Sequence, residues 1–211
     1  MQAGTRIESP AKLVPGLWTV NQIPAARLHA PLVVMNGLAA EVMGLYGQAL
    51  DNHLLVPRLE AALPRIQGDT TQLRQVIHNL VQNALDAVAD RPDGQVELIT
   101  STARGEHGEL LAVRLTVIDN GPGFADKVLK RAFEPYVTTK VKGTGLGLAV
   151  VKKIADEHGA RLRAANLHKS DEADGPITGA RVSLSFSNFA ATPAALTEGA
   201  GRGAALVARN A

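Results

Sequence analysis

The sequence contains no cysteine, only seven aromatic residues and no long hydrophobic run. Without cysteine it cannot form a disulfide, a thiolate zinc site, an iron–sulfur cluster or a cysteine nucleophile, which fits a reducing cytoplasm. The apolar runs, such as residues 146–151, are far shorter than the ~20 residues that span a bilayer, and the N-terminus lacks the charged-then-apolar order of a signal peptide. We therefore expect a cytoplasmic chain with no membrane segment.

The sequence also lacks an excess of charge of one sign. Its 211 residues carry 22 Lys and Arg against 20 Asp and Glu, a net charge of +2, with an isoelectric point of about 9.0. This balance, with few aromatic side chains to stack on bases, argues against nucleic acid as a partner. With 45% hydrophobic residues, the composition is typical of an ordinary globular protein of one or two domains.

Apolar spacing predicts alternating helices and strands. The strongest helix covers residues 71–89, and further helices are predicted over residues 37–50, 125–133 and 145–158. Strands are predicted over residues 54–59, 95–102, 110–119, 161–166 and 180–187. Asp69 or Thr70 is expected to cap the long helix and Gly159 to end the last one, while Pro57 restricts its strand to a sheet edge. In the strand over residues 110–119, one face is expected to hold Leu111, Val113, Leu115 and Val117.

This order of elements predicts the fold class α+β. We expect a two-layer sandwich in which helices cover one face of a mixed, mostly antiparallel sheet. The first 31 residues, with four prolines, and the Ala- and Gly-rich tail over residues 190–211 show no sustained periodicity. Little structure is therefore predicted at either end.

Polar residues on the long helix form the first candidate site. Asn79 and Asn83 are four residues apart and therefore share one side of the helix, with Asp86 about one turn further. Such oxygens can bind a hard cation together with substrate phosphates. Two Asn residues at this spacing are, however, more often ordinary polar residues at the boundary of a buried face.

The second candidate site is the segment from Asp119 to Phe124. Strand alternation places Asp119 on the same face as Val117 and Leu115, so its carboxylate points to the apolar side and needs a hydrogen-bond donor. A ligand amino group could supply that donor, and Gly121 and Gly123 would permit close approach. Taken alone, an Asp-Asn-Gly sequence is more often an ordinary turn.

The third candidate site is glycine-rich and opens a helix. Backbone N–H groups and the helix dipole favour an anion such as phosphate at this position, which comprises Gly143, Thr144, Gly145, Leu146, Gly147 and Leu148. Lys140 and Lys142 add positive charge just upstream. The segment matches neither a Walker loop nor a dinucleotide-binding fingerprint, and alone it is a weak signal.

Together and in this order, the segments resemble the motifs of a known family. Residues 79–87, 119–123, 132–140 and 143–152 are similar to the N box, first glycine box, F box and second glycine box of bacterial sensor histidine kinases. The resemblance covers roughly residues 65–188, and residues 133–140, Phe-Glu-Pro-Tyr-Val-Thr-Thr-Lys, are most similar to the nitrogen-regulation branch. It implies the Bergerat ATP-binding fold of the GHKL superfamily, which gyrase, Hsp90 and MutL share, with ATP and Mg²⁺ as cofactors.

The resemblance also implies roles for individual residues. Asn83 would coordinate Mg²⁺, with Asn79 next to the metal and the phosphates, and Asp119 would accept the adenine amino group. Gly121 and Gly123 would pass under the base. The remaining roles implied are a mobile lid anchored by Phe133, a phosphate contact from Lys140, and phosphate-binding backbone amides at Gly145, Leu146 and Gly147.

One departure from the superfamily bears on the reaction. Hydrolytic members carry a Glu four residues before the metal-binding Asn, where this chain has Asn79, and an amide cannot take a proton from water. The chain is therefore expected to hold ATP for transfer to another nucleophile. The alternatives are a GHKL-type ATPase, an anti-sigma-factor serine kinase and a nucleotide-binding module without catalysis. Gly179-Ala180 stands where many kinases have Gly-Thr, which puts that adenine contact in doubt.

The resemblance further implies partners outside this chain. None of the six histidines stands in the sequence context of a phosphorylated acceptor, so the acceptor is expected on a separate dimerisation domain, with a response regulator downstream. We expect residues 1–60 to hold the remnant of a helical dimerisation region and linker, residues 61–189 the catalytic domain, and residues 190–211 a tail. On this interpretation the chain is a fragment, and its parent could still be an inner-membrane sensor.

Overall fold

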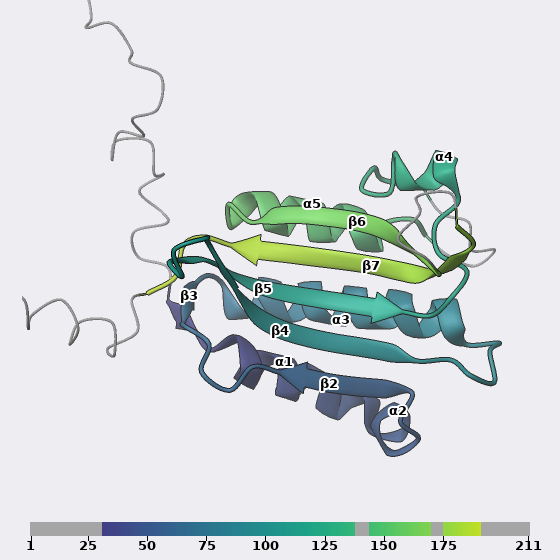
Figure 1. Ribbon diagram of the computed structural model, residues 1–211, viewed down its shortest axis with the longest axis horizontal. Coiled ribbons are helices and arrows are strands. Elements are labelled where there is room, and N and C mark those ends of the chain that lie inside the picture. The colour runs from purple at the N-terminus through teal and green to yellow at the C-terminus, as the bar shows by residue number, and fades with distance from the viewer. Residues whose placement is uncertain (1–30, 138–143, 170–174, 191–211) are drawn as a thin grey trace, which may run out of the picture.

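The computed structural model describes residues 31–137, 144–169 and 175–190, and these form a sheet layer and a helix layer (Figure 1). The strands are β1 (Leu32–Val33), β2 (Leu55–Leu59), β3 (Ile66–Gln67), β4 (Val96–Arg104), β5 (Leu110–Asp119), β6 (Arg161–His168) and β7 (Ile177–Phe186). The helices are α1 (Met35–Met43), α2 (Gly47–Asp51), α3 (Thr70–Val88), α4 (Asp126–Leu129) and α5 (Gly147–Glu157). The ends predicted to have little structure lie almost entirely outside the described residues.

Five strands form the main sheet, in the order β2-β4-β5-β7-β6. β2 pairs with β4 in parallel and all other neighbours are antiparallel. Helices α1, α3 and α5 cover one face of this sheet (Figure 1). The predicted α+β two-layer sandwich is therefore confirmed, and β2, which contains Pro57, is an edge strand as predicted.

The long helix α3 lies at the centre of the core because its apolar residues recur at helical spacing. Its buried residues are Leu73, Val76, Ile77, Leu80, Val81, Ala84 and Val88. The side chain of Asp69 caps its N-terminus by accepting a hydrogen bond from Gln72 N–H at 2.9 Å. His158, at the C-terminus of α5, accepts a hydrogen bond from the Asp69 N–H at 2.9 Å through Nε2, so the ends of the two helices are joined.

Elements that precede residue 61, where the predicted catalytic domain begins, share this core. Five residues of α1 are buried, and Asn36 connects α1 to the sheet. Its side chain donates to the Glu60 carbonyl at 2.7 Å and accepts from the buried Thr100 hydroxyl at 2.7 Å. The folded core therefore includes α1 and β2.

Several predicted elements differ in extent from the structure. The helix predicted over residues 37–50 is α1, a 3-10 turn at Gly44–Tyr46 and α2, because the glycines at 44 and 47 interrupt the regular helix. Only residues 126–129 of the predicted helix 125–133 are α-helical. Leu111 is exposed, unlike the residues predicted to share its face, since it lies beside the register shift at Ala103/Arg104. The short β1–β3 pair was not predicted.

Candidate functional site

A cavity of about 500 Å³ lies between α3, the ends of β5 and β7, and the segments on either side of residues 138–143. Its size is in the range of small-molecule sites. Three segments far apart in the sequence contribute the predicted site residues that line it, namely Asn83, Asp86, Asp119, Gly123, Thr144, Gly145, Gly147 and Leu148. The fold thus brings the three candidate sites together around one cavity.

Asp119 provides a buried carboxylate to this cavity. It is 8% exposed, and Val117, which strand alternation places on the same side, lines the cavity with it. Its Oδ1 accepts a hydrogen bond from the Gly121 N–H at 2.9 Å. Ala180 and Val182 of the neighbouring strand and Phe124 add apolar surface. A planar base with an exocyclic amino group fits this combination of apolar walls and one strong acceptor.

Asn120 fixes the turn that follows Asp119. Its Oδ1 accepts from Gln95 N–H at 2.8 Å and its Nδ2 donates to the Asp93 carbonyl at 2.7 Å. The turn is therefore anchored to the connection between α3 and β4, which holds the Asp119 backbone in place. The position of the carboxylate follows from these contacts and from the sheet register.

The glycines after Asp119 are required by close backbone approach. A Cβ at Gly121 would lie 2.8 Å from Asp119 Oδ1 and 2.9 Å from the Ala87 carbonyl oxygen. Gly123 has φ +72°, and a Cβ there would lie 2.5 Å from Ile177 Cγ2. Gly121 does not line the cavity, so its observed effect is to let the chain turn beside Asp119.

Helix α3 places Asn83 and Asp86 at the cavity, whereas the half-buried Asn79 does not line it. Asn83 lies close to the start of α5, since a Cβ on Gly147 would be 3.3 Å from Asn83 Nδ2. No three His, Asp or Glu side chains converge on a metal-sized space among the described residues. A cation here would therefore depend on amide oxygens and on oxygens of a bound phosphate.

The N-terminus of α5 also lines the cavity. Gly147 begins the helix, and the N-cap residue Leu146 provides no side-chain cap for the N–H groups of its first turn. Gly145 has φ +67° and its carbonyl accepts from Tyr136 N–H at 3.0 Å, which joins the segments on either side of residues 138–143. Free amides and the helix dipole favour an anion at this position. Asp119 and the start of α5 thus line the same cavity, which offers an acceptor for a base and a binding site for phosphates.

A hydrogen-bonded chain runs from Asp86 to the N-terminal part of the core. Gln82 Nε2 donates to Asp86 Oδ1 at 2.7 Å, and the Tyr46 hydroxyl contacts His78 Nδ1 at 2.8 Å and Gln82 Oε1 at 3.4 Å. Burial, and secondly the negative charge of Asp86, raise the pKa of the Tyr46 hydroxyl. The position of Asp86 is therefore linked to that of the segment between α1 and α2.

Two residues important to the site were not predicted as such. Asn166 of β6 accepts from Phe124 N–H at 2.7 Å and donates to the Phe124 carbonyl at 2.8 Å, which fixes the chain leaving the first glycine box. Gly179 lies so close to Asp119 that a Cβ would overlap the Asp119 carbonyl oxygen. Asn is uncommon within strands, so the position of Asn166 in a predicted strand was the sequence feature that could have indicated its role.

The other predicted residues are placed less directly. Phe133 is half-buried and does not line the cavity, whereas its neighbour Ala132 is buried and does. Leu146 is also absent from the lining. Lys140 and Gly143 lie outside the described residues, so their roles stay predictions.

Comparison with known proteins identifies the family. The model of the histidine kinase-, DNA gyrase B- and HSP90-like ATPase family matches residues 68–189, more than half of the chain. The chain belongs to this family. Among the described residues of this family member, no helix is long and apolar enough to cross a membrane.

Curated relatives of this ATPase-family chain include sensor histidine kinases. It is 43% identical over 108 residues to the sensory histidine kinase/phosphatase NtrB of Rhizobium leguminosarum bv. phaseoli, which covers 47% of the chain and 28% of that protein. It is 39% identical over 146 residues to the sensor histidine kinase ZraS of Escherichia coli K12, covering 68% and 30% respectively. The chain therefore spans less than a third of the length of these relatives.

Solved structures confirm the fold. The catalytic domain of the histidine kinase ThkA superimposes with a TM-score of 0.60 at 26% identity, over 75% of this chain and 95% of that one. Full-length ShkA in complex with AMPPNP also gives 0.60, at 28% identity, over 80% and 34%. The resemblance to histidine kinase catalytic domains inferred from the four boxes is thus confirmed.

Proposed function

We propose that the chain is the catalytic part of a sensor histidine kinase, which binds Mg-ATP and transfers the γ-phosphoryl group to a histidine on a separate dimerisation domain. The cavity supports this proposal because a buried carboxylate and the N-terminus of a helix both line it. A relative crystallised with AMPPNP, an ATP analogue, has the same fold. Since the substrate is ATP, we place the reaction in the cytoplasm.

The observation that favours phosphoryl transfer over ATP hydrolysis is the amide side chain of Asn79. In hydrolytic members of the superfamily this position is a Glu that activates water, and an amide cannot accept that proton. The described residues that line the cavity include no Glu and no His, and their two carboxylates are Asp86 and Asp119. One oxygen of Asp86 already accepts a hydrogen bond from Gln82, which weakens it as a base. Water in this site therefore lacks a good general base.

The proposed roles follow the placement of the residues. Asp119 binds the adenine amino group, Asn83 provides an amide oxygen for Mg²⁺, and the first amides of α5 bind phosphate. Asn79, half-buried one turn before Asn83, acts next to the metal and the phosphates. Catalysis by this chain then comes from positioning and electrostatics, because the phosphoryl group passes to the acceptor histidine without a covalent bond to a residue of this chain.

The deciding experiment combines this chain with γ-labelled ATP and a dimerisation domain that carries an acceptor histidine. We expect label on that domain that is lost in acid, as phosphohistidine is, and no label when the acceptor is changed to Gln. Nucleotide binding without such label would remove the kinase assignment.

The same experiment distinguishes the alternatives. Rapid steady-state phosphate release by the chain alone, without an acceptor, would identify a GHKL-type ATPase. Acid-stable label on a Ser of an added protein would identify a serine kinase of the anti-sigma-factor kind. Transfer of the label from the acceptor to a response regulator would place the chain in a two-component system.

A further inference from the structure

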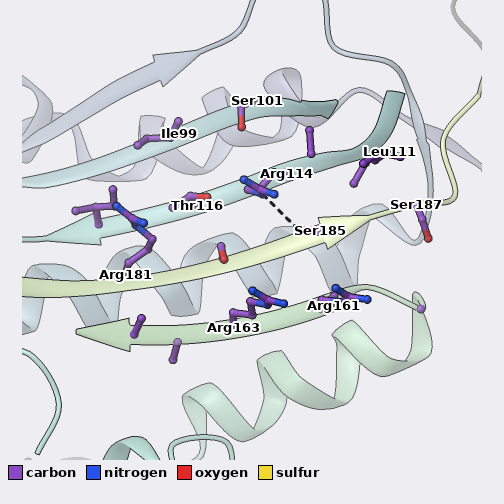
Figure 2. A pocket seen from close by; sticks show the side chains of 17 residues that line it. Ile99, Ser101, Leu111, Arg114, Thr116, Arg161, Arg163, Arg181, Ser185 and Ser187 are labelled. Carbon is purple, nitrogen blue, oxygen red and sulfur yellow. Dashed lines mark hydrogen bonds between the residues drawn. The ribbon is translucent and has the colours of Figure 1, made fainter. Parts of the chain in front are cut away.

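The face of the main sheet that the helices leave open carries a group of four arginines. They lie around a shallow depression of about 820 Å³ that spans β4 to β6 (Figure 2). Arg114 comes from β5, Arg181 from β7, and Arg161 and Arg163 from β6. All four are exposed, and we call this surface the arginine face.

The strand register places three of these arginines on either side of a column of serines on β7, and Arg181 continues that column. Ser185 of β7 lies opposite Arg114 on one neighbour and Arg161 on the other, and Ser183 lies opposite Arg163. Strands are ~4.8 Å apart and alternate residues along one strand ~6.7 Å apart. Guanidinium groups are therefore based at intervals of about 7 Å along β6 and about 10 Å across the sheet, with hydroxyl groups between them.

In the described part of the chain, no carboxylate forms an ion pair with an arginine of this face. The arginines that ion pairs join to carboxylates are Arg58, Arg74, Arg91 and Arg131 among the described residues. No Asp or Glu lines the depression in the part of the chain that the structure describes. Because the whole chain has a net charge of +2, the rest of it has a net charge of −2. Opposite charges on neighbouring strands stabilise a sheet, but the described cross-strand partners of these four arginines are uncharged.

The arrangement indicates the chemistry of a partner. Arginines bind carboxylates and phosphates through paired N–H groups, and serine hydroxyls add donors. The described lining includes no Phe, Tyr or Trp, so nucleic acid bases would find no stacking surface. On an α-helix, residues i and i+4 are separated by ~6 Å along the axis and residues i and i+7 by ~10.5 Å. For a helix that lies along β6, glutamates at i and i+4 match the interval between Arg161 and Arg163, and glutamates at i+7 and i+11 extend the row towards Arg181, which pairs with Ala165.

We propose that the arginine face docks an acidic α-helix of a partner protein. The site is separate from the nucleotide cavity, although both use the same strand. Ala180 and Val182 of β7 line the cavity, whereas the residues that alternate with them, Arg181 and Ser183, lie on the open face. Docking therefore requires no nucleotide and does not depend on the proposed kinase reaction.

The test uses the full 211-residue chain and a fluorescein-labelled, alanine-based helical peptide with Glu at positions i, i+4, i+7 and i+11. Fluorescence anisotropy measures its dissociation constant, with a Gln-substituted peptide as the matched probe. The double variant Arg161→Gln/Arg163→Gln removes two exposed charge contacts and is expected to weaken binding about two- to thirtyfold. The control Arg74→Gln/Arg91→Gln removes the same charge on other surfaces and is expected to leave binding unchanged.

Three results would overturn the proposal. The first is that the Gln peptide binds as tightly as the Glu peptide, and the second is that the control variant loses as much affinity as the arginine-face variant. The third is that a single-stranded oligodeoxynucleotide binds more tightly than the peptide and that the arginine-face variant abolishes this binding. If the β6 variant fails to fold, Arg114→Gln/Arg181→Gln tests the same face from β5 and β7. Saturating AMPPNP is expected to leave the dissociation constant of the peptide unchanged. Failure of the docking proposal is therefore distinguishable from failure of the kinase proposal. Competition between AMPPNP and the peptide would contradict two separate sites.

Discussion

Replacing Asp119 by Asn tests the proposed contact with the base, with minimal change in side-chain shape. The Asn Oδ1 can still accept the Gly121 N–H that Asp119 Oδ1 accepts at 2.9 Å, so the turn is expected to remain. The Asn Nδ2, however, presents a donor, and an adenine amino group is also a donor. ATP therefore loses its hydrogen bond to a charged group at a site that is 8% exposed.

The loss of such a charge-assisted hydrogen bond costs ~1.5–3 kcal/mol, which corresponds to about ten- to a hundredfold in ATP affinity. Isothermal titration calorimetry with Mg-ATP measures it, and thermal unfolding checks that the variant is folded. Asp90→Asn, an exposed carboxylate just after α3, is the matched control.

GTP makes the test sharper. Guanine carries a carbonyl where adenine carries the amino group, so Asp119 repels it and the Asn variant can donate to it. The ratio of ATP affinity to GTP affinity is therefore expected to fall by a larger factor than the ATP affinity itself. Unchanged ATP affinity in a folded variant, or an equal loss for both nucleotides, would refute the assignment of Asp119 to the base.

Three further predictions concern the glycines and Tyr46. Gly179→Ala places a Cβ on the Asp119 carbonyl oxygen and is expected to lower the free energy of unfolding by about 1–3 kcal/mol in urea denaturation, whereas Gly44→Ala, with open space around it, is not expected to lower it. Gly145→Ala, at φ +67° and with its Cβ 2.6 Å from the Tyr136 carbonyl carbon, is expected to weaken Mg-ATP binding in calorimetry without a large change in melting temperature. Because the pKa of the Tyr46 hydroxyl is raised in the folded state, this hydroxyl ionises at lower pH in the unfolded chain than in the folded one. The contribution of Tyr46 to the free energy of unfolding is therefore fully present below about pH 10 and is lost at higher pH. Tyr46→Phe should therefore flatten the alkaline decline in stability, and an unchanged decline would contradict a raised pKa of Tyr46.

The sequence predicted those features that depend on periodicity and on local order. Helix α3 begins and ends within one residue of its predicted bounds, and Asp69 caps it as predicted. Both features could be predicted because the apolar residues and the capping residue follow one another closely in the sequence. β5 matches its predicted range, and alternation along it correctly placed Asp119 with Val117. The four boxes in order were enough to predict the family and the fold, because each box is a local motif.

What the sequence could not predict depends on contacts between distant segments. Asn166 fixes Phe124 across 42 residues of sequence, and Gly179 faces Asp119 only because β5 and β7 pair in one register. The pairing of β1 with β3 joins two strands of two residues each, which are too short to show alternation. The arginine face was invisible for the same reason, since its arginines are spread over β5, β6 and β7.

The register of β7 determines both surfaces at once. Side chains alternate along a strand, so a shift by one residue would turn Arg181 into the cavity and Ala180 onto the open face. Burying an arginine beside Asp119 would fill the base site with a charged pair, and the serine column would be lost from the arginine face. The close approach of Gly179 to Asp119 opposes such a shift, because any other residue moved to that point would bring a Cβ against the Asp119 carbonyl. The glycine therefore acts on both proposed sites through the register, although it does not line either cavity.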